Sequence, residues 1–298
     1  MSRIPDESLL QLENEVLRAL VTRDESHLHV IGYGEISTVL MVQTPEGNFA
    51  CKRLPVFPRR EDAQEIVDAI NSYITALEAA GITCVDSDSR IVDSPNGTYT
   101  VYSVQPRLPA DRLGPAYFRT LSIEEAMEAT RTVWDRIAQA TSPILAPDGQ
   151  LANWAFLDDD VVYLDVSTPF MRDDQGKELL NWRHYANTVP FYIRWYFMRE
   201  VPKVMDKYHS LRGQLLDYIG NLIKEDLELL VAPLIEEANT HYISGTPITR
   251  ADVQAYYKED ASGYELLQKV KRWDRTFYRT ILRKPYPYIL PPKIDRNT

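Results

Sequence analysis

A glycine pair and a lysine lie close together near the start of the sequence. Gly32 and Gly34 are one residue apart and stand between apolar runs, in a chain with only 12 glycines. Lys52 follows in the apolar run FACK. Glycine lets a backbone approach phosphate oxygens and offers them amide N–H groups, and a lysine among apolar residues needs a counter-charge. The stretch therefore fits a phosphate-binding loop, and it also fits an ordinary hairpin whose lysine reaches water.

Acidic and amide side chains gather in a second stretch, PDGQLANWAFLDDDVVYLDVSTPF. Asp148 and Asn153 are five residues apart, and Asp165 ends the apparent strand VVYLD. One carboxylate can orient or deprotonate a hydroxyl group, while an amide oxygen and a second carboxylate can hold Mg²⁺ against phosphates. A single aspartate near a turn is more often a turn cap, and we interpret residues 158–160 in that way.

The elements that must position these residues change in kind along the chain. Residues 1–24 predict an N-terminal helical extension, and residues 25–105 predict mainly strands with one helix before Gly81. Residues 106–298 predict a mainly helical part that contains one short hairpin. Capping boxes at Ser122 and Thr249 mark two helix starts in that part. This order predicts an α+β fold rather than a doubly wound parallel sheet.

Taken together, these residues resemble the protein-kinase-like superfamily, and more closely its aminoglycoside-phosphotransferase-type members. The glycine-loop pattern G-x-G-x-x-G-x-V is filled by Gly32, Gly34, Ser37 and Val39. The lysine strand, the D-x-x-x-x-N loop and the later aspartate follow in the same order as in that superfamily. The resemblance implies a bilobal fold, with a small antiparallel-sheet N-lobe that has one helix and a larger, mainly helical C-lobe.

The resemblance also implies roles for single residues and two cofactors, ATP and Mg²⁺. Lys52 would contact the α- and β-phosphates, and Asp148 would be the catalytic aspartate. Asn153 and Asp165 would bind Mg²⁺. The adenine would meet the backbone around Val104 and Gln105.

Four departures from the superfamily pattern keep two functions open. Ala146 replaces the histidine of the catalytic loop, serine replaces the last glycine of D-F-G, and no A-P-E segment follows. The fourth departure is that the helix after Lys52 has no glutamate clearly aligned to pair with the lysine. Glu65 and Asp68 are candidates, although the best spacing falls on Ile70. The first hypothesis is a phosphotransferase that acts on a hydroxyl of a small molecule bound by the helical part. The second is a pseudokinase, a nucleotide-binding or regulatory protein that has lost phosphotransfer.

Composition narrows the class of partner. The net charge is −10 and the pI is about 5.1, which argues against nucleic acid as the main partner. Two cysteines give no disulfide scaffold. The sequence begins without the pattern of a signal peptide, and the apolar window FYIRWYFM is too short to cross a bilayer. We therefore expect a cytoplasmic protein without a membrane partner.

The C-terminal segment departs from this acidic average. Residues 269–298 carry nine Lys or Arg against two Asp, about +7 in local charge. A site for phosphate, nucleic acid or an acidic partner is one interpretation. The favoured one is a helix whose face of Trp273, Phe277 and Ile281 packs into the core.

Overall fold

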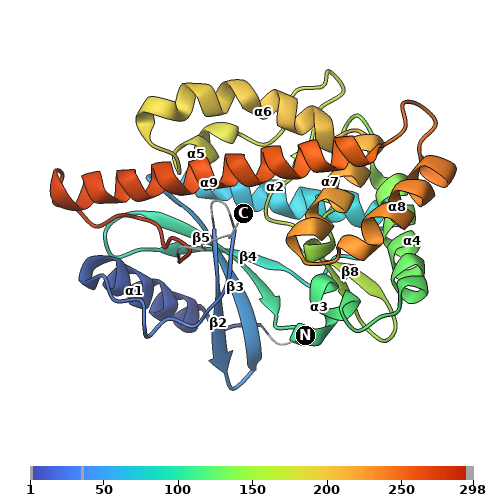
Figure 1. The fold of residues 1–298 in the computed structure, drawn as a ribbon. Coiled ribbons are helices and arrows are strands. Elements are labelled where there is room, and N and C mark those ends of the chain that lie inside the picture. The colour runs from blue at the N-terminus through green and yellow to red at the C-terminus, as the bar shows by residue number, and fades with distance from the viewer. Residues whose placement is uncertain (1–2, 35–36, 293–298) are drawn as a thin grey trace.

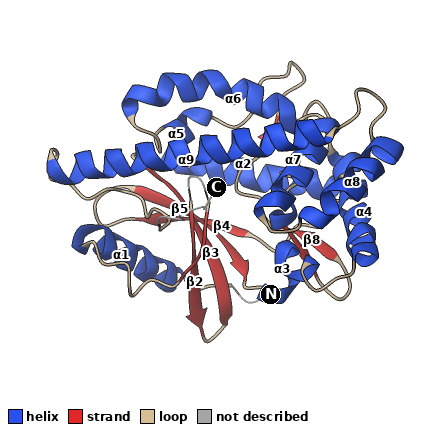
Figure 2. Ribbon diagram, in the orientation of Figure 1, coloured by secondary structure: helices blue, strands red, loops and turns tan. Residues whose placement is uncertain are grey.

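The computed structural model describes residues 3–34 and 37–292, which form an α+β fold with one main sheet (Figures 1 and 2). The sheet has five strands in the order β1-β2-β3-β5-β4, and each neighbouring pair is antiparallel. The strands are β1 (Val30–Tyr33), β2 (Thr38–Thr44), β3 (Gly47–Phe57), β4 (Asp88–Asp93) and β5 (Tyr99–Pro106). The expected α+β class and the antiparallel sheet are confirmed.

Two helices cover the two faces of this sheet. Helix α1 (Asp6–Thr22) packs on the face that carries Cys51, where Leu9 and Val16 join its apolar cluster. Helix α2 (Arg60–Ala79) packs on the opposite face, which carries Leu54. Because side chains alternate along a strand, Lys52 belongs to the α2 face.

The α1 face also contains a fully buried carboxylate, Glu13. Two nitrogens of Arg53 donate to it at 2.8 Å, and the hydroxyls of Ser94, Thr100 and Tyr102 donate at 3.1, 3.1 and 2.7 Å. Burial alone would raise the pKa of Glu13, but Arg53 and the hydroxyl donors outweigh it and hold this pKa below its ordinary value. The network fixes α1 to the middle of the sheet.

The remainder of the chain is mainly helical, as the sequence pattern predicts. The helices are α3 (Gly114–Phe118), α4 (Ile123–Ala140), α5 (Trp182–Ala186), α6 (Arg194–Tyr208), α7 (Leu211–Lys224), α8 (Val231–Glu237) and α9 (Arg250–Thr280). Short hairpin-like pairs join β6 (Leu145–Ala146) with β9 (Phe170–Met171) and β7 (Trp154–Phe156) with β8 (Val161–Tyr163). Capping boxes open α4 at Ser122 and α9 at Thr249, so both predicted helix starts are confirmed.

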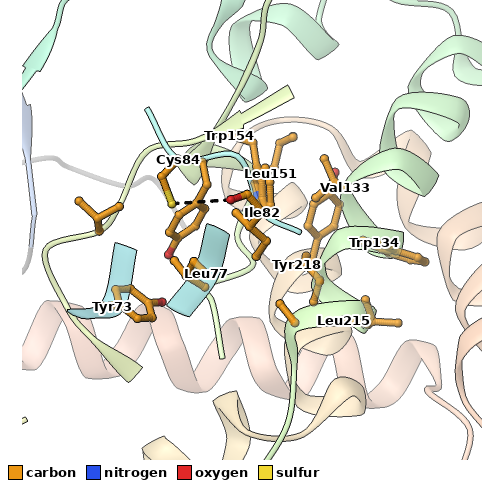
Figure 3. Close-up of a cluster of buried hydrophobic side chains, with 14 of the residues drawn as sticks. Tyr73, Leu77, Ile82, Cys84, Val133, Trp134, Leu151, Trp154, Leu215 and Tyr218 are labelled. Atoms are coloured by element: carbon orange, nitrogen blue, oxygen red, sulfur yellow. Dashed lines mark hydrogen bonds between the residues drawn. The ribbon is translucent and has the colours of Figure 1, made fainter. Parts of the chain in front are cut away.

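One apolar core joins the sheet part to the helical part. Figure 3 shows Tyr73 and Leu77 of α2 in the same buried cluster as Trp134 of α4, Trp154 of β7 and Tyr218 of α7. Each of these five side chains is fully buried. Because Tyr73 and Leu77 of α2 belong to the same cluster as side chains of α4 and α7, the position of α2 depends on the packing of the helical part.

Both cysteines are free, as the composition suggests. Cys51 lies in β3, and Cys84 contacts the carbonyl oxygen of Ile82 at the edge of the core (Figure 3). Within residues 3–34 and 37–292, no helix combines the length and apolarity needed to cross a bilayer.

Helix α9 corrects one prediction. Trp273, Phe277 and Ile281 do not pack into the core, because their exposed fractions are 78%, 43% and 66%. The buried face of this part of α9 carries Gln268, Lys271 and Asp274 instead. Helix α9 runs across the sheet part in Figure 1, where Gln268 and Lys271 lie with Arg53 and Leu54 of β3 and with the C-terminal segment around one small cavity. The apolar periodicity is real, but the neighbouring surface decides which face is covered.

Candidate functional site

Lys52 and Asp165 form an ion pair, although 113 residues separate them in the sequence. The lysine Nζ lies 2.8 Å from Asp165 Oδ1, and the two side chains are 22% and 24% exposed. The hydroxyl and the backbone N–H of Ser167 donate to the same oxygen at 2.8 and 3.2 Å. Burial alone would raise the pKa of Asp165, but Lys52 and Ser167 outweigh it and lower this pKa. Asp165 therefore stays charged and faces the sheet.

Asp148 lies in the loop after β6, and its carboxyl group behaves differently. Burial, and then the charges of Asp217 and Asp165, raise its pKa to about 8, while Lys207 opposes this effect. Its backbone N–H donates to the hydroxyl of Tyr163 at 2.9 Å, which fixes the loop against β8. Asp148 therefore keeps its proton to a higher pH than a free aspartate does.

Asn153 lies beside Asp148 in the same loop. Its side-chain amide nitrogen donates to the backbone oxygen of Asp148 at 3.2 Å. This contact fixes the amide plane and turns the carbonyl oxygen of Asn153 away from that bond. Asp165 offers a charged carboxylate and Asn153 an amide oxygen, and hard oxygen donors of these types are the ligands that Mg²⁺ prefers.

Buried polar side chains hold the backbone of the Asp148 loop. The amide of Gln214, on α7, donates to the carbonyl of Pro147 and accepts from the N–H of Gly149 at 3.0 Å. A Cβ atom at Gly149 would lie 2.6 Å from the amide oxygen of Gln214, so a larger residue would displace this amide from the loop. On the other side, the hydroxyl of Tyr73 donates to the carbonyl of Ala146 at 2.7 Å. Tyr73 thus holds this end of the loop through the backbone carbonyl of Ala146, since the methyl side chain of Ala146 offers no hydrogen bond.

Replacing Gln214 by leucine is expected to destabilise the fold by about 2–3 kcal/mol, because buried loop groups lose their partners. Urea denaturation followed by circular dichroism would measure the change. Gln64→Leu is the matched control, since the side chain of Gln64 is exposed on α2 and donates to nearby Asp68. Equal changes in the two variants would contradict the role assigned to Gln214.

The glycine stretch forms the turn between β1 and β2, and residues 35–36 lie outside the described residues. Gly32 pairs with Val39, and the N–H of Gly34 donates to the carbonyl of Ser37 at 3.0 Å. A Cβ atom at Gly34 would lie 2.6 Å from the hydroxyl of Ser37. Val39 also pairs with Lys52, so the strand that leaves this turn runs directly beside the lysine.

The two predicted adenine-binding residues, Val104 and Gln105, direct their side chains to opposite faces of the sheet. Gln105 donates to the carbonyl of Leu164 at 2.7 Å, directly before Asp165, and so lies next to the ion pair. The side chain of Val104 belongs to the apolar cluster on the α1 face, and only its backbone could serve a ligand on the other face.

The two acidic candidates on α2 contact other groups. Glu65 lies 3.1 Å from His184 Nε2, and Asp68 accepts from Gln64 at 2.9 Å. Asp165 is thus the acidic partner that Lys52 has in this structure.

The sequence analysis did not identify Gln214, Asp217 or Tyr73 as part of the site. Gln214 and Asp217 are polar residues one turn apart in the mainly apolar stretch LLDYIGNLI and its flank. Polar residues on the apolar face of a helix were the available signal.

The fold and the site define an α+β protein that gathers a lysine, two aspartates and an asparagine where its sheet meets its helices. Residues 11–275 match a family described as "Family of unknown function (DUF6206)". Because the match covers most of the 298 residues, the chain belongs to this family. None of the curated proteins matches the chain.

Proposed function

We propose that the protein is an ATP- and Mg²⁺-dependent phosphotransferase that acts on a hydroxyl group of a small molecule. The observation that carries the proposal is the Lys52–Asp165 ion pair, which lies beside the glycine turn and close to Asp148. The order β1-β2-β3-α2-β4-β5, followed by helices, supports the resemblance to the protein-kinase-like superfamily and to its bilobal arrangement.

Each residue has a role that its surroundings support. Lys52 exchanges its contact with Asp165 for the phosphates of the nucleotide, and Gly32 and Gly34 allow the backbone to approach the same phosphates closely. Asp165 and Asn153 hold Mg²⁺, which neutralises phosphate charge when it is bound. Asp148 orients the acceptor hydroxyl and takes up its proton.

A pseudokinase is the second candidate, and the chemistry of Asp148 favours it. A carboxyl group with a pKa of about 8 is mostly protonated at neutral pH, and a protonated carboxyl is a poor base. In this interpretation the site binds MgATP without transferring its phosphate.

Calorimetric titration of MgATP into the wild type and into Asp165→Ala tests the shared part of both candidates. The wild type is expected to bind ATP only when Mg²⁺ is present. Asp165→Ala is expected to weaken binding by about 100-fold, or ~2.7 kcal/mol, because the metal loses its carboxylate ligand.

Asp158→Ala is the control, since Asp158 lies in the same hairpin but is exposed and pairs with Arg112. It is expected to bind like the wild type. Absence of MgATP binding by the wild type at millimolar concentration would refute both candidates. If the wild type binds MgATP, a screen of hydroxyl compounds separates the two candidates. Consumption of MgATP with one of these compounds would support the phosphotransferase, and no consumption with any of them would support the pseudokinase.

A further inference from the structure

A second polar cluster lies in the helical part, where α6, α7 and α9 meet. The ammonium of Lys207 donates to the hydroxyl of Tyr256 at 2.6 Å and lies 3.5 Å from a carboxylate oxygen of Asp217. The hydroxyl of Tyr256 in turn donates to that same oxygen. The ammonium also lies 4.5 and 4.6 Å from the ring centroids of Tyr208 and Tyr256. Lys207 is therefore held in one position by three helices.

Two glycines of α7 allow this close approach. A Cβ atom at Gly213 would lie 2.2 Å from the backbone oxygen of Lys207, and one at Gly220 would lie 2.5 Å from the ring of Tyr256. Glycine weakens the interior of a helix, so its presence on both sides of Asp217 needs a reason. Here that reason is the contact that brings Lys207 and Tyr256 onto Asp217.

The cluster faces the Asp148 loop. Gln214, one turn before Asp217 on α7, binds the loop on both sides of Asp148. Asp148 also responds to the cluster electrostatically, since Asp217 raises its pKa and Lys207 lowers it. The same amide of Gln214 donates to the backbone oxygen of Tyr208 at 2.9 Å, directly after Lys207, so one side chain joins the cluster to the loop.

We propose that Lys207 contacts the terminal phosphate of the bound nucleotide and stabilises the phosphoryl group during its transfer. This inference rests on the proposed function. An ammonium has three N–H donors, and the contacts to Tyr256 and Asp217 leave a donor for an anionic oxygen. The side chain is 26% exposed, whereas Asp217 is fully buried and serves to hold it. Charge on the transferring group requires cations placed in advance, and Lys207 would add a second ammonium to that of Lys52.

The comparison of MgATP with MgADP tests this role directly, because only MgATP carries the terminal phosphate. In calorimetric titrations, Lys207→Met is expected to bind MgATP about tenfold more weakly than the wild type. Its affinity for MgADP is expected to change less than twofold. Lys203→Met is the matched control, since Lys203 lies one turn earlier on α6, is 70% exposed and pairs with Glu200. It is expected to leave both affinities unchanged.

The variant Lys207→Met leaves Asp217 buried without its cation, so thermal melting must accompany the titrations. The double variant Lys207→Met with Asp217→Asn removes both charges and keeps the experiment decisive if the single variant unfolds. Asp217→Asn alone is expected to keep the preference for MgATP, and the double variant is expected to lose it.

Two results would overturn the inference in distinguishable ways. Equal weakening of MgATP and MgADP, or no weakening of either, would show that Lys207 does not contact the terminal phosphate, while nucleotide binding by the wild type would stand. Absence of nucleotide binding by the wild type would instead remove the proposed function on which the inference rests.

Discussion

Asparagine in place of Asp148 is expected to reduce consumption of MgATP by about 10³-fold and to leave MgATP binding within twofold. A positioned acid or base contributes about 10²–10⁴-fold to such a reaction, and asparagine can neither accept nor release the proton. Asp158→Asn, on the exposed hairpin, is the control and is expected to retain activity. Unchanged consumption in Asp148→Asn would remove Asp148 from the chemistry.

The same substitution is expected to stabilise the unliganded protein at alkaline pH. The pKa of Asp148 is about 8 in the folded protein, against about 3.9 in an unfolded chain. The folded state therefore retains a proton that the unfolded state has lost, and this group's contribution to stability falls as the pH rises from about 4 to about 8. Asparagine has no such loss, so Asp148→Asn should melt above the wild type at pH 8.5, by a margin that shrinks towards pH 4. An equal margin at both pH values would contradict the raised pKa.

Loss of the Glu13 carboxylate is expected to cause the largest change in stability. Glu13→Ala leaves the guanidinium of Arg53 buried without its carboxylate, and breaking a buried pair in this way costs about 3–5 kcal/mol. Urea denaturation would measure the loss. Because the pKa of Glu13 is lowered in the fold, its contribution is present above the unfolded-state pKa and disappears as the pH falls through the folded-state pKa.

Two further variants separate charge burial from packing. Glu13→Leu combined with Arg53→Leu removes both charges and is expected to be more stable than Glu13→Ala, since replacing a buried pair by apolar groups is often close to neutral. Glu15→Ala, which removes a carboxylate from the same helix, is expected to cost less than about 0.5 kcal/mol. A small loss in Glu13→Ala would show that the network contributes little.

The sequence predicts the parts of this protein that local chemistry determines. The glycines at 32 and 34, the turn signals of the strands and the caps at Ser122 and Thr249 each act within a few residues, and each element lies where its pattern indicates. The Lys52–Asp165 contact joins distant segments, and only a resemblance to known proteins could place those two side chains on one site.

Contacts across the fold account for what the sequence could not predict. The periodicity of α9 correctly indicates an amphipathic helix, yet the opposite face is the covered one, so Gln268 and Asp274 are buried and Trp273 is exposed. Glu13 follows the same logic, because a carboxylate on an apolar helix face signals a buried partner without naming Arg53.

The crossing of α9 has a consequence for the mechanics of the molecule. The chain passes from sheet to helices once after β5, and it returns along α9 to a C-terminal segment that lies on the sheet. There Arg53 donates to the carbonyl of Pro287 at 3.4 Å, and Tyr288 donates to that of Asn187 at 3.3 Å. The sheet part and the helical part are thus connected at two places, by the chain after β5 and by α9 with the C-terminal segment. Any rotation that separates the glycine turn from Asp148 must either bend a 31-residue helix or detach this segment.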